Sequence, residues 1–328
     1  MAVLLRSLIL FFLLQTANDA VCQAGSADTE KFITLADPAI LNDKGVYYLY
    51  GTVGGNADNG FQVYLSTDLK KWRLSTETPD GFALKKGDAY GDKGFWAPHV
   101  FKYRNRYYMA YVANENIAIA VSDFPYGPFT QEIKAPLAAP VKQIDPFVFF
   151  DKGKIYMYHV RLTKGNRLFV AEMNEDLSAI KEETLRECLS AEDKWENTAG
   201  SEWPVAEGPT VIKRKGLYYF IYSANDFRNP DYAVGYATAS DPMGNWNKYR
   251  QNPILTKKQA GINGPGHGDL FYDKKGRMYY VFHTHQSDTR VGPRKTAIVE
   301  ARFVKTKEGE KLEFLMDTMY FLEKDPGK

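Results

Sequence analysis

The sequence has little cysteine and no excess of charge of one sign. Only 2 cysteines occur among 328 residues, so at most one disulfide can form and a disulfide-rich scaffold is excluded. Lys and Arg total 42 against 40 Asp and Glu, a formal net charge of +2. This balance lacks the basic excess typical of a nucleic-acid binder. Charged residues at 25% and hydrophobic residues at 44% predict a folded globular chain instead of a disordered one.

No apolar run is long enough to cross a membrane, so no integral membrane segment is predicted. The run Leu8 to Leu14, preceded by Arg6, is far shorter than the roughly 20 apolar residues that span a bilayer. A basic start, a short apolar run and small residues after it predict a signal peptide over residues 1–24, with an exported chain, periplasmic or secreted, over 25–328. In a second interpretation Cys22 is the lipidated first residue of a lipoprotein.

Several catalytic motifs are also missing. The sequence contains no Gly-x-Ser-x-Gly elbow for a nucleophilic serine and no His-Glu-x-x-His motif for a catalytic zinc ion. It has no Asp-x-Asp-x-Asp-Gly calcium loop, so the residues themselves do not demand a metal. Cys188 is interpreted as a small buried hydrophobic residue and receives no functional role.

Aromatic residues, in contrast, are abundant. The chain has 22 Tyr, 20 Phe and 5 Trp, which together make up 14% of the residues. Tyr and Phe favour β-strands, so this composition predicts an all-β protein. Flat aromatic surfaces also suit a protein that binds sugars.

A repeated hairpin pattern runs along the whole chain. Five segments combine a short charged turn, usually Lys-Gly, with an aromatic-rich strand, at intervals of about 50 to 60 residues, and their anchors are Tyr47, Tyr107, Tyr156, Tyr218 and Tyr279. A further strand follows each hairpin. Five such units predict a single-domain, five-bladed β-propeller, and an ordinary β-sandwich fits five matched units poorly. A short helix is expected only within Asp176 to Glu192.

Ten to twelve residues before each anchor tyrosine lies a cluster of polar and turn-forming residues. Aligned in one register, these clusters present Asp37, Trp96, Asp145, Glu207 and His267. The inner strands of propeller blades begin near the central axis, so these side chains should converge there. Three converging carboxylates repel one another and resist burial. Strand-entry turns explain any one position, but the whole set points to acid/base chemistry on a substrate.

These residues carry a resemblance to a known family. From Phe32 to Phe303 the chain resembles glycoside hydrolase family 43, whose members are five-bladed propellers that cleave arabinose-, xylose- or galactose-containing glycans. The motifs that carry the resemblance are Asp37-Pro38, Trp96-Ala97-Pro98, Ile144-Asp145-Pro146, Glu207-Gly208-Pro209 and Gly264-Pro265-Gly266-His267.

The resemblance implies hydrolysis with inversion by three carboxylates. Asp37 matches the general base that activates water, and Glu207 matches the general acid that protonates the leaving oxygen. Asp145 matches the third carboxylate, which orients the acid and helps to set its pKa. An inverting pair leaves room for a water molecule between its carboxyl groups.

The resemblance also suggests residues that bind the substrate. Trp96 is expected to stack on a sugar face, and Phe61 to line the pocket, although both are also good core residues. Arg294 is expected on the substrate or the acid, with Arg290 as a competitor, while Glu202 is a decoy near Glu207. His267 matches an axial histidine that in many members binds water or a structural Ca²⁺, so a Ca²⁺ at the propeller axis is a possible but not a required cofactor.

The expected partner is therefore an oligo- or polysaccharide, and the sequence says nothing of oligomeric state. The leading prediction is an exo-acting α-L-arabinofuranosidase. A β-xylosidase and a β-galactofuranosidase or galactanase remain alternatives, because the choice depends on the shape of the pocket. A non-catalytic sugar-binding propeller is the alternative of another class. The long segment from Leu185 to Val205, before Glu207, is expected to influence specificity.

Overall fold

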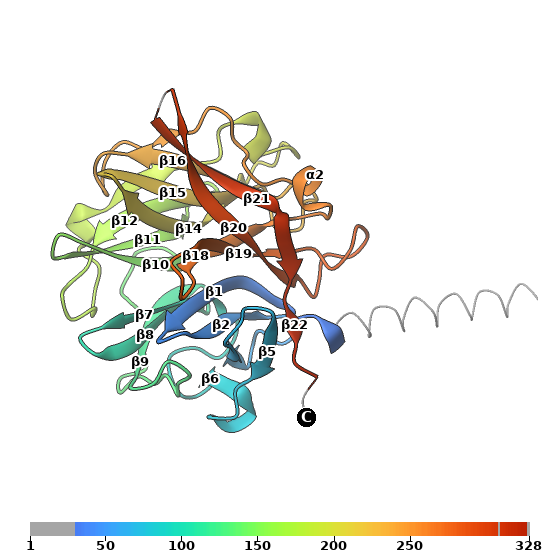
Figure 1. Cartoon of the computed structure of the whole chain (residues 1–328). Coiled ribbons are helices and arrows are strands. Elements are labelled where there is room, and N and C mark those ends of the chain that lie inside the picture. The colour runs from blue at the N-terminus through green and yellow to red at the C-terminus, as the bar shows by residue number, and fades with distance from the viewer. Residues whose placement is uncertain (1–29, 308, 327–328) are drawn as a thin grey trace, which may run out of the picture.

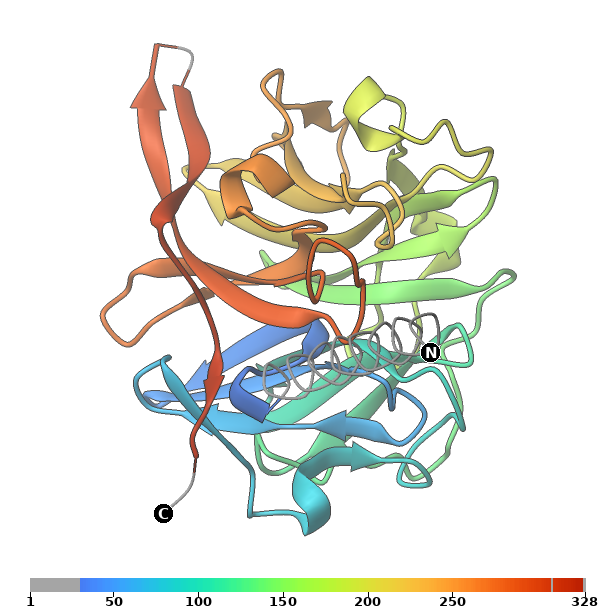
Figure 2. The ribbon, with the colours of Figure 1, turned by 90° about the vertical axis from the view of Figure 1, so that its right-hand side faces the viewer.

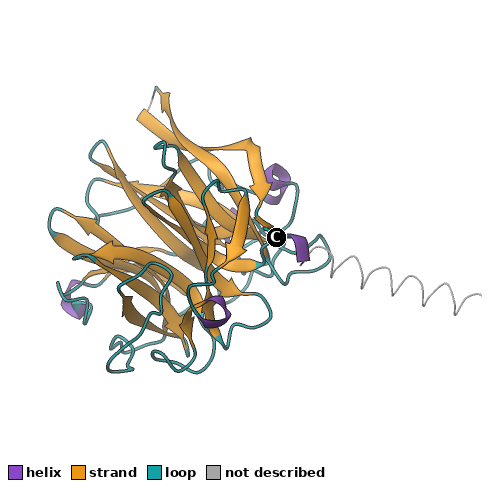
Figure 3. Cartoon of the chain, turned by 60° about the horizontal axis from the view of Figure 1, so that its bottom comes forward, coloured by secondary structure: helices purple, strands orange, loops and turns teal. Residues whose placement is uncertain are grey.

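The chain folds into five β-sheets arranged as blades around a central axis, which confirms the predicted all-β, five-bladed propeller. A computed structural model describes residues 30–307 and 309–326. Strands dominate the molecule, and the helices are short and peripheral (Figure 1, Figure 3). The predicted signal peptide over residues 1–24 and Cys22 lie outside the described residues. Nowhere in the described ranges is there an apolar helix of membrane-spanning length.

Each blade is an antiparallel sheet whose strands follow one another from the axis outward. Blade one holds β1 (Leu35–Asp43), β2 (Val46–Val53), β4 (Tyr64–Ser66) and β5 (Lys71–Leu74). Blade two holds β7 (Trp96–Tyr103), β8 (Arg106–Ala113) and β9 (Asn116–Ser122). Blade three holds β10 (Gln143–Asp151), β11 (Lys154–Leu162), β12 (Asn166–Glu172) and β13 (Arg186–Leu189). Blade four holds β14 (Ala206–Arg214), β15 (Leu217–Ala224), β16 (Ala233–Ala239) and β17 (Asn247–Lys248). Blade five holds β18 (Gly266–Tyr272), β19 (Met278–Thr284), β20 (Lys295–Thr306) and β21 (Gly309–Phe321).

The remaining elements are small. A two-stranded sheet pairs β3 (Gly60–Gln62) with β6 (Phe82–Lys85). The helical segments are η1 (Pro79–Gly81), η2 (Glu182–Thr184), η3 (Lys194–Glu196) and α2 (Lys257–Ala260). The helix expected within Asp176 to Glu192 is thus reduced to the single 3₁₀ turn η2, because this segment instead supplies β13, the outer strand of blade three.

The inner hairpins are closed by the tight turns that the sequence predicts. In blades one and three, Lys44-Gly45 and Lys152-Gly153 form two-residue turns in which both residues have positive φ, between 49° and 85°. Such turns match the twist of the flanking strands, and glycine adopts the second conformation without steric cost. The same geometry recurs in blade four, which confirms the repeat at this level.

A β-bulge interrupts every innermost strand at the axis. The bulge residues Asp37, Ala97, Asp145, Gly208 and His267 all have positive φ, between 42° and 61°. In four blades the next residue is proline, which cannot donate a ladder hydrogen bond and is tolerated where pairing is broken. Blade five has Gly268 there, where a Cβ would lie 1.8 Å from the carbonyl oxygen of Val281.

These bulges correct one detail of the sequence alignment. The positions equivalent to Asp37 and Asp145 are Ala97 and Gly208, not Trp96 and Glu207, which lie one residue earlier. In these blades the bulge residue is the one directly before the proline. Blades one to four are therefore aligned by their X-Pro pairs. Trp96 and Glu207 keep regular ladder partners, Val112 and Ser223 respectively.

The C-terminal segment closes the ring. Strand β22 (Glu323–Lys324) pairs in parallel with β5 at the outer edge of blade one, so the last residues of the chain complete the first blade (Figure 2). Leu322, just before it, is fully buried, and its carbonyl oxygen accepts a hydrogen bond from the backbone N–H of Ile33 at 2.9 Å. Both ends of the ring are therefore fixed at one seam.

Candidate active site

Three carboxylates from three inner strands face one cavity at the axis. Asp37 lies on β1, Asp145 on β10 and Glu207 on β14, and each is at most 8% exposed. The cavity, of about 480 Å³, is lined by all three together with Trp96, His267 and Arg294. The sequence prediction that these side chains converge is thus matched by their positions. Such a concave site with a few polar groups has the size of a small-molecule pocket.

At each of three bulges a backbone N–H group has no partner in the strand ladder. A side chain of the preceding blade accepts its hydrogen bond instead. The N–H of Ala97 donates to Thr52 Oγ1 at 3.0 Å, and that of His267 donates to Ser223 Oγ at 2.7 Å. The N–H of Gly208 donates to Asp145 Oδ2 at 3.1 Å. Asp145 therefore holds the backbone at the residue directly after Glu207, which positions the glutamate.

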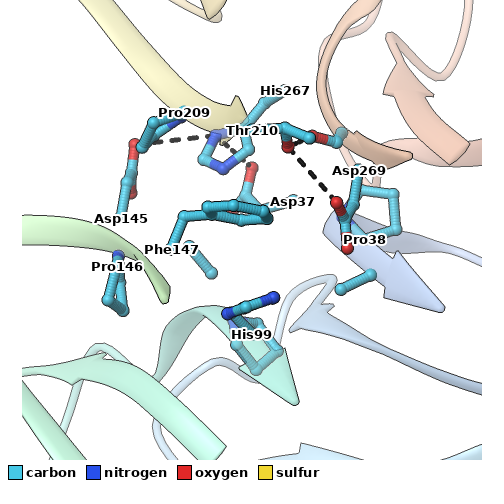
Figure 4. Close-up of a pocket in the computed structure, with 14 residues that line it drawn as sticks. Asp37, Pro38, His99, Asp145, Pro146, Phe147, Pro209, Thr210, His267 and Asp269 are labelled. Carbon is cyan, nitrogen blue, oxygen red and sulfur yellow. Dashed lines mark hydrogen bonds and ion pairs between the residues drawn. The ribbon is translucent and has the colours of Figure 1, made fainter. Parts of the chain in front are cut away.

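Asp37 is surrounded by hydrogen-bond donors from the last blade and its own. Arg294 Nη1 donates to Asp37 Oδ1 at 3.0 Å, and Thr52 Oγ1 donates to Asp37 Oδ2 at 2.7 Å. His267 Nδ1 lies 3.4 Å from Oδ1. His283 Nδ1 lies at the same distance and accepts a hydrogen bond from the backbone N–H of Asp37 at 3.2 Å. Figure 4 shows the His267 ring between Asp37 and Asp145, whose Oδ2 is 3.7 Å from the same nitrogen.

These neighbours keep Asp37 ionised. Burial by itself would raise the pKa of Asp37, but nearby groups, above all the Arg294 guanidinium, outweigh it, so the pKa lies well below its usual value. Burial also lowers the pKa of both histidines, to about 3 for His283. Because both rings are neutral near pH 7, Arg294 supplies the positive charge that stabilises the carboxylate.

Glu207 has the opposite protonation behaviour. Tyr232 Oη donates to Glu207 Oε1 at 2.8 Å, and Asn166 Nδ2 donates to Glu207 Oε2 at 3.0 Å. These hydrogen bonds favour the ionised form, yet burial dominates and raises the pKa of Glu207 to about 7. A carboxyl group that keeps its proton near neutral pH is suited to act as an acid.

Asp145 and Glu207 titrate as a pair. Burial raises the pKa of Asp145 well above its usual value, and the nearby charge of Glu207 raises it further. Two buried like charges are expensive to ionise together, so the pair retains a proton near neutral pH. Asp37, stabilised by Arg294, stays negative beside them. The cavity therefore holds both an ionised and a protonated carboxyl group.

The residues around His267 give no support for a metal in the chemistry. Nδ1 of His267 faces the two aspartates, and Ca²⁺ prefers six to eight oxygen ligands. In residues 30–307 and 309–326, no group of three or more His, Cys, Asp or Glu side chains has an arrangement that could hold a metal ion. The Ca²⁺ suggested by the family resemblance stays a prediction, and no catalytic step depends on it.

The remaining predicted residues separate into two groups. Trp96 is partly buried and lines the cavity, and Arg294 contacts Asp37 rather than the acid. Phe61 does not line the cavity: it is fully buried between Phe95 and Tyr111, with ring centroids 5.8 Å and 5.7 Å away, so the expectation for Phe61 was wrong. Its strand, β3, belongs to the added two-stranded sheet, which turns the ring into the core.

The two rejected competitors, Arg290 and Glu202, are exposed loop residues that do not line the cavity. Several residues that contact the catalytic-site aspartate and glutamate were not predicted from the sequence, namely Thr52, Asn166, Tyr232 and His283. None belongs to a motif near the carboxylates. Their only sequence signal is position, because Thr52 and His283 lie opposite or beside the bulge on the second strand of a predicted hairpin.

Comparisons with known proteins agree with this geometry. The model of glycosyl hydrolases family 43 matches residues 33–306. A crystal structure from Bacteroides thetaiotaomicron, described as an endo-1,4-beta-xylanase, is 40% identical, with a TM-score of 0.82, and the match covers 90% of this chain and 99% of that one. A thermostable family-43 glycoside hydrolase is 35% identical, with a TM-score of 0.77, over 86% of this chain and 93% of the other.

Curated relatives are more distant. A xylosidase/arabinosidase of Bacteroides ovatus is 28% identical over 76% of this chain and 85% of its own length. A beta-D-galactofuranosidase of Aspergillus niger is 24% identical over 80% of this chain and 78% of its own length. Because the family model covers most of the chain, the chain belongs to glycosyl hydrolases family 43. It is a glycoside hydrolase with a five-bladed propeller.

Proposed function

We propose that this enzyme hydrolyses its glycosidic bond in one step with inversion at the anomeric carbon. Asp37 is the general base: its carboxylate takes a proton from a water molecule, whose oxygen attacks the anomeric carbon. Glu207 is the general acid: it gives its proton to the glycosidic oxygen as that bond breaks. Asp145 is a positioning residue that holds the backbone after Glu207 through Gly208.

One observation carries this proposal. Within one cavity, Asp37 has a pKa well below its usual value while Glu207 has a pKa of about 7. A base must be ionised and an acid must be protonated at the same pH, and only such divergent environments permit it. A purely sugar-binding propeller, the alternative of another class, has no need for two buried carboxyl groups in opposite protonation states.

We propose that the enzyme is exported and removes a terminal α-L-arabinofuranosyl residue from a glycan. A cavity of about 480 Å³ at the axis supports exo action on a single terminal sugar. A β-xylosyl residue is the second candidate, because relatives are named xylosidase/arabinosidase and the 40% identical structure is described as an endo-1,4-beta-xylanase. The galactofuranosidase of Aspergillus niger supports a third, the β-galactofuranosyl residue.

Export itself is proposed from the residues of the signal peptide, and lipidation at Cys22 is its alternative. A relative in Thermotoga petrophila, 24% identical, is named an extracellular endo-arabinanase, which supports export. Detection of the chain in the culture medium or periplasm, with the mature N-terminus determined by mass spectrometry, separates these outcomes from a cytoplasmic chain.

The test of function is sugar release from aryl α-L-arabinofuranoside, aryl β-D-xyloside, aryl β-galactofuranoside, arabinan and arabinogalactan. Wild type is compared with Asp37→Asn and with a matched control, Asp273→Asn, which changes a buried aspartate in the turn directly after β18. We expect release by wild type and control but not by Asp37→Asn. Proton NMR during the first turnovers should show the inverted anomer. The retained anomer, or full activity in Asp37→Asn, contradicts the proposal.

A further inference from the structure

A large exposed aromatic side chain lies at the mouth of the catalytic cavity. Trp203 is 48% exposed, although tryptophan is usually buried, and it belongs to the long segment between β13 and β14. It lines the catalytic cavity and also a second, adjoining cavity of about 500 Å³. The two cavities share Trp203, Val205, Asp226 and Arg228, so they lie next to each other along this wall.

Trp203 is connected to Glu207 by two hydrogen bonds. Its indole Nε1 donates to Asn166 Oδ1 at 2.9 Å, and Asn166 Nδ2 donates to Glu207 Oε2 at 3.0 Å. An indole N–H can only donate, so it fixes the amide of Asn166 with its oxygen towards Trp203. The amide nitrogen must then face Glu207. The orientation of the asparagine that contacts Glu207 thus depends on Trp203.

The second cavity is rimmed by polar side chains held in place by the same segment. Asn197 Oδ1 accepts a hydrogen bond from the N–H of Ser201 at 2.8 Å, and Asn225 Oδ1 accepts one from the N–H of Thr198 at 2.8 Å. Asn229 Nδ2 donates to Thr198 Oγ1 at 3.0 Å. A wall with an aromatic face and several amide groups presents both the apolar and the polar contacts that a sugar ring offers.

The position of the acid determines which part of a substrate reaches this wall. The acid protonates the oxygen of the leaving group, so the leaving group lies on the side of Glu207. Asn166 and Trp203 extend from Glu207 towards the second cavity. The sugar beyond the broken bond therefore points at Trp203.

We propose that Trp203 is the platform for the leaving-group sugar and that, through Asn166, it positions Glu207. The inference rests on the proposed function and names a narrower substrate class: an oligo- or polysaccharide with a second sugar on the leaving side, in preference to a simple glycoside. Binding of that sugar and orientation of Glu207 then depend on the same side chain.

The first experiment separates platform from scaffold. The ratio kcat/KM is measured for Trp203→Ala, wild type and the exposed-aromatic control Phe124→Ala, on an activated aryl glycoside and on an oligosaccharide of the sugar that wild type releases. We expect the oligosaccharide kcat/KM of Trp203→Ala to fall at least about tenfold more than its aryl kcat/KM. Because weaker positioning of the acid would also affect the oligosaccharide more, Trp203→Phe is measured beside it. This variant keeps the aromatic face but loses the N–H to Asn166, so it should retain most of the oligosaccharide activity that Trp203→Ala loses, and an equal loss in both variants overturns the platform. The control should keep the wild-type ratio between the substrates. Equal losses on both substrates, or no loss, overturn the platform.

The second experiment tests the link to the acid. Trp203→Phe keeps an aromatic face but removes the N–H that orients Asn166. The hydrogen bond from Asn166 lowers the pKa of Glu207, so its loss raises that pKa and moves the alkaline limb of kcat/KM to higher pH. The other groups that face Glu207, namely Asp37, Asp145, Tyr232 and Arg294, are unchanged in this variant. An unmoved alkaline limb overturns the positioning role.

Failure of this inference is distinguishable from failure of the proposed function. If wild type cleaves the substrates and Glu207→Gln does not, the function holds, whatever Trp203 does. If wild type cleaves none of them, the function fails, and calorimetric binding of arabino- and xylo-oligosaccharides still decides the platform. Weaker binding to Trp203→Ala than to wild type and Phe124→Ala supports it, and equal binding to all three overturns it.

Discussion

Arg294 and Asp37 are 257 residues apart in the chain, yet Arg294 Nη1 lies 3.0 Å from Asp37 Oδ1. The contact joins the segment between β19 and β20 of blade five to the innermost strand of blade one, across the seam where the ring closes. The same guanidinium lies over the ring of Phe227, with its Cζ 4.4 Å from the ring centroid. The charge on Asp37 therefore depends on correct closure of the propeller.

Replacing this arginine should change the pH profile on its acid side. In Arg294→Gln, Asp37 remains buried but loses its cation, so the pKa of Asp37 rises. The acid limb of kcat/KM then moves to higher pH, because a base that is protonated cannot activate water. We expect a loss of about 10²-fold at pH 7. Arg294→Lys keeps the positive charge but not the planar guanidinium, so its kcat/KM at pH 7 should lie between those of wild type and Arg294→Gln. If the acid limb of Arg294→Gln does not move, a group other than Arg294 stabilises the ionised form of Asp37.

The loss of activity should depend on the leaving group of the substrate when Glu207 is replaced, but not when Asp37 is replaced. Glu207→Ala should lose about 10²–10⁴-fold on natural glycosides but far less on aryl glycosides whose leaving group needs no proton. Asp37→Asn should lose activity on both kinds of substrate, because water must be activated in each case. Kinetics on a series of aryl glycosides of increasing leaving-group pKa measure this slope. A slope that is unchanged in Glu207→Ala assigns the acid to another residue.

The raised pKa of Glu207 also predicts a gain in stability on substitution. The folded chain retains a proton up to about pH 7, whereas the unfolded chain loses it near 4.5. The resulting destabilisation is absent below about pH 4.5, grows as pH rises and is complete above about pH 7. Glu207→Gln should therefore raise the free energy of unfolding by about 1–3 kcal/mol at pH 8 and change it little at pH 4. Thermal melts at both pH values test this, and a gain of equal size at both would contradict it.

A buried ion pair fixes the loop that leads to the cavity mouth. Glu196 is fully buried and accepts hydrogen bonds from Lys248 Nζ at 2.6 Å and Tyr222 Oη at 2.5 Å. Lys248→Met removes the cation but leaves the hydrogen bonds from Tyr222 and from the N–H groups of Glu192 and Asp193, so it should destabilise the fold by about 3 kcal/mol, the low end for a broken buried ion pair. The double variant Glu196→Gln with Lys248→Met should recover part of that loss. Urea unfolding of the three proteins measures the coupling, and additive losses would mean that the pair contributes no interaction energy.

The residue before the closing strand β22 should contribute strongly to the stability of the fold. Leu322 is fully buried at the seam between the first and last blades. Leu322→Ala should cost about 2–5 kcal/mol, because the cavity it leaves cannot collapse between two sheets. Met316→Ala, a partly buried change on the same blade, is the control and should cost less. A fall in unfolding free energy no larger than that of the control would show that the seam is not critical.

The sequence predicted the parts of this molecule that repeat. Turns such as Lys44-Gly45 demand positive φ, and aromatic strands follow them at regular spacing, so blade number and order were accessible. The positions of Asp37, Asp145 and Glu207 were accessible because each lies within two residues of a proline in a recurring motif. The exact register was not, because a bulge shifts pairing by one residue without changing composition.

Features formed by contacts between distant segments were less accessible. Asn166 and Tyr232 contact Glu207 from 41 and 25 residues away, and nothing in their neighbourhoods indicates it. Phe61 was misplaced because aromatic residues serve the core and the pocket equally well in sequence. Only the added β3–β6 sheet decides between them.

The repeated bulge has a consequence for how such an enzyme can be redesigned. At five equivalent sites the backbone already turns a side chain out of the ladder, and the occupants range from Ala97 and Gly208 to Asp37 and His267. Strand pairing on either side is therefore maintained with four residue types at the site, although a Cβ at Gly208 would lie 2.9 Å from the His267 ring. Ala97 is the small occupant in blade two, and it lines a narrow space at the axis beside Asp37, Asp145 and His267, not the catalytic cavity itself. A short carboxylate or amide is the group this site is expected to accept, because Asp37 and Asp145 already adopt the same positive φ at the equivalent positions.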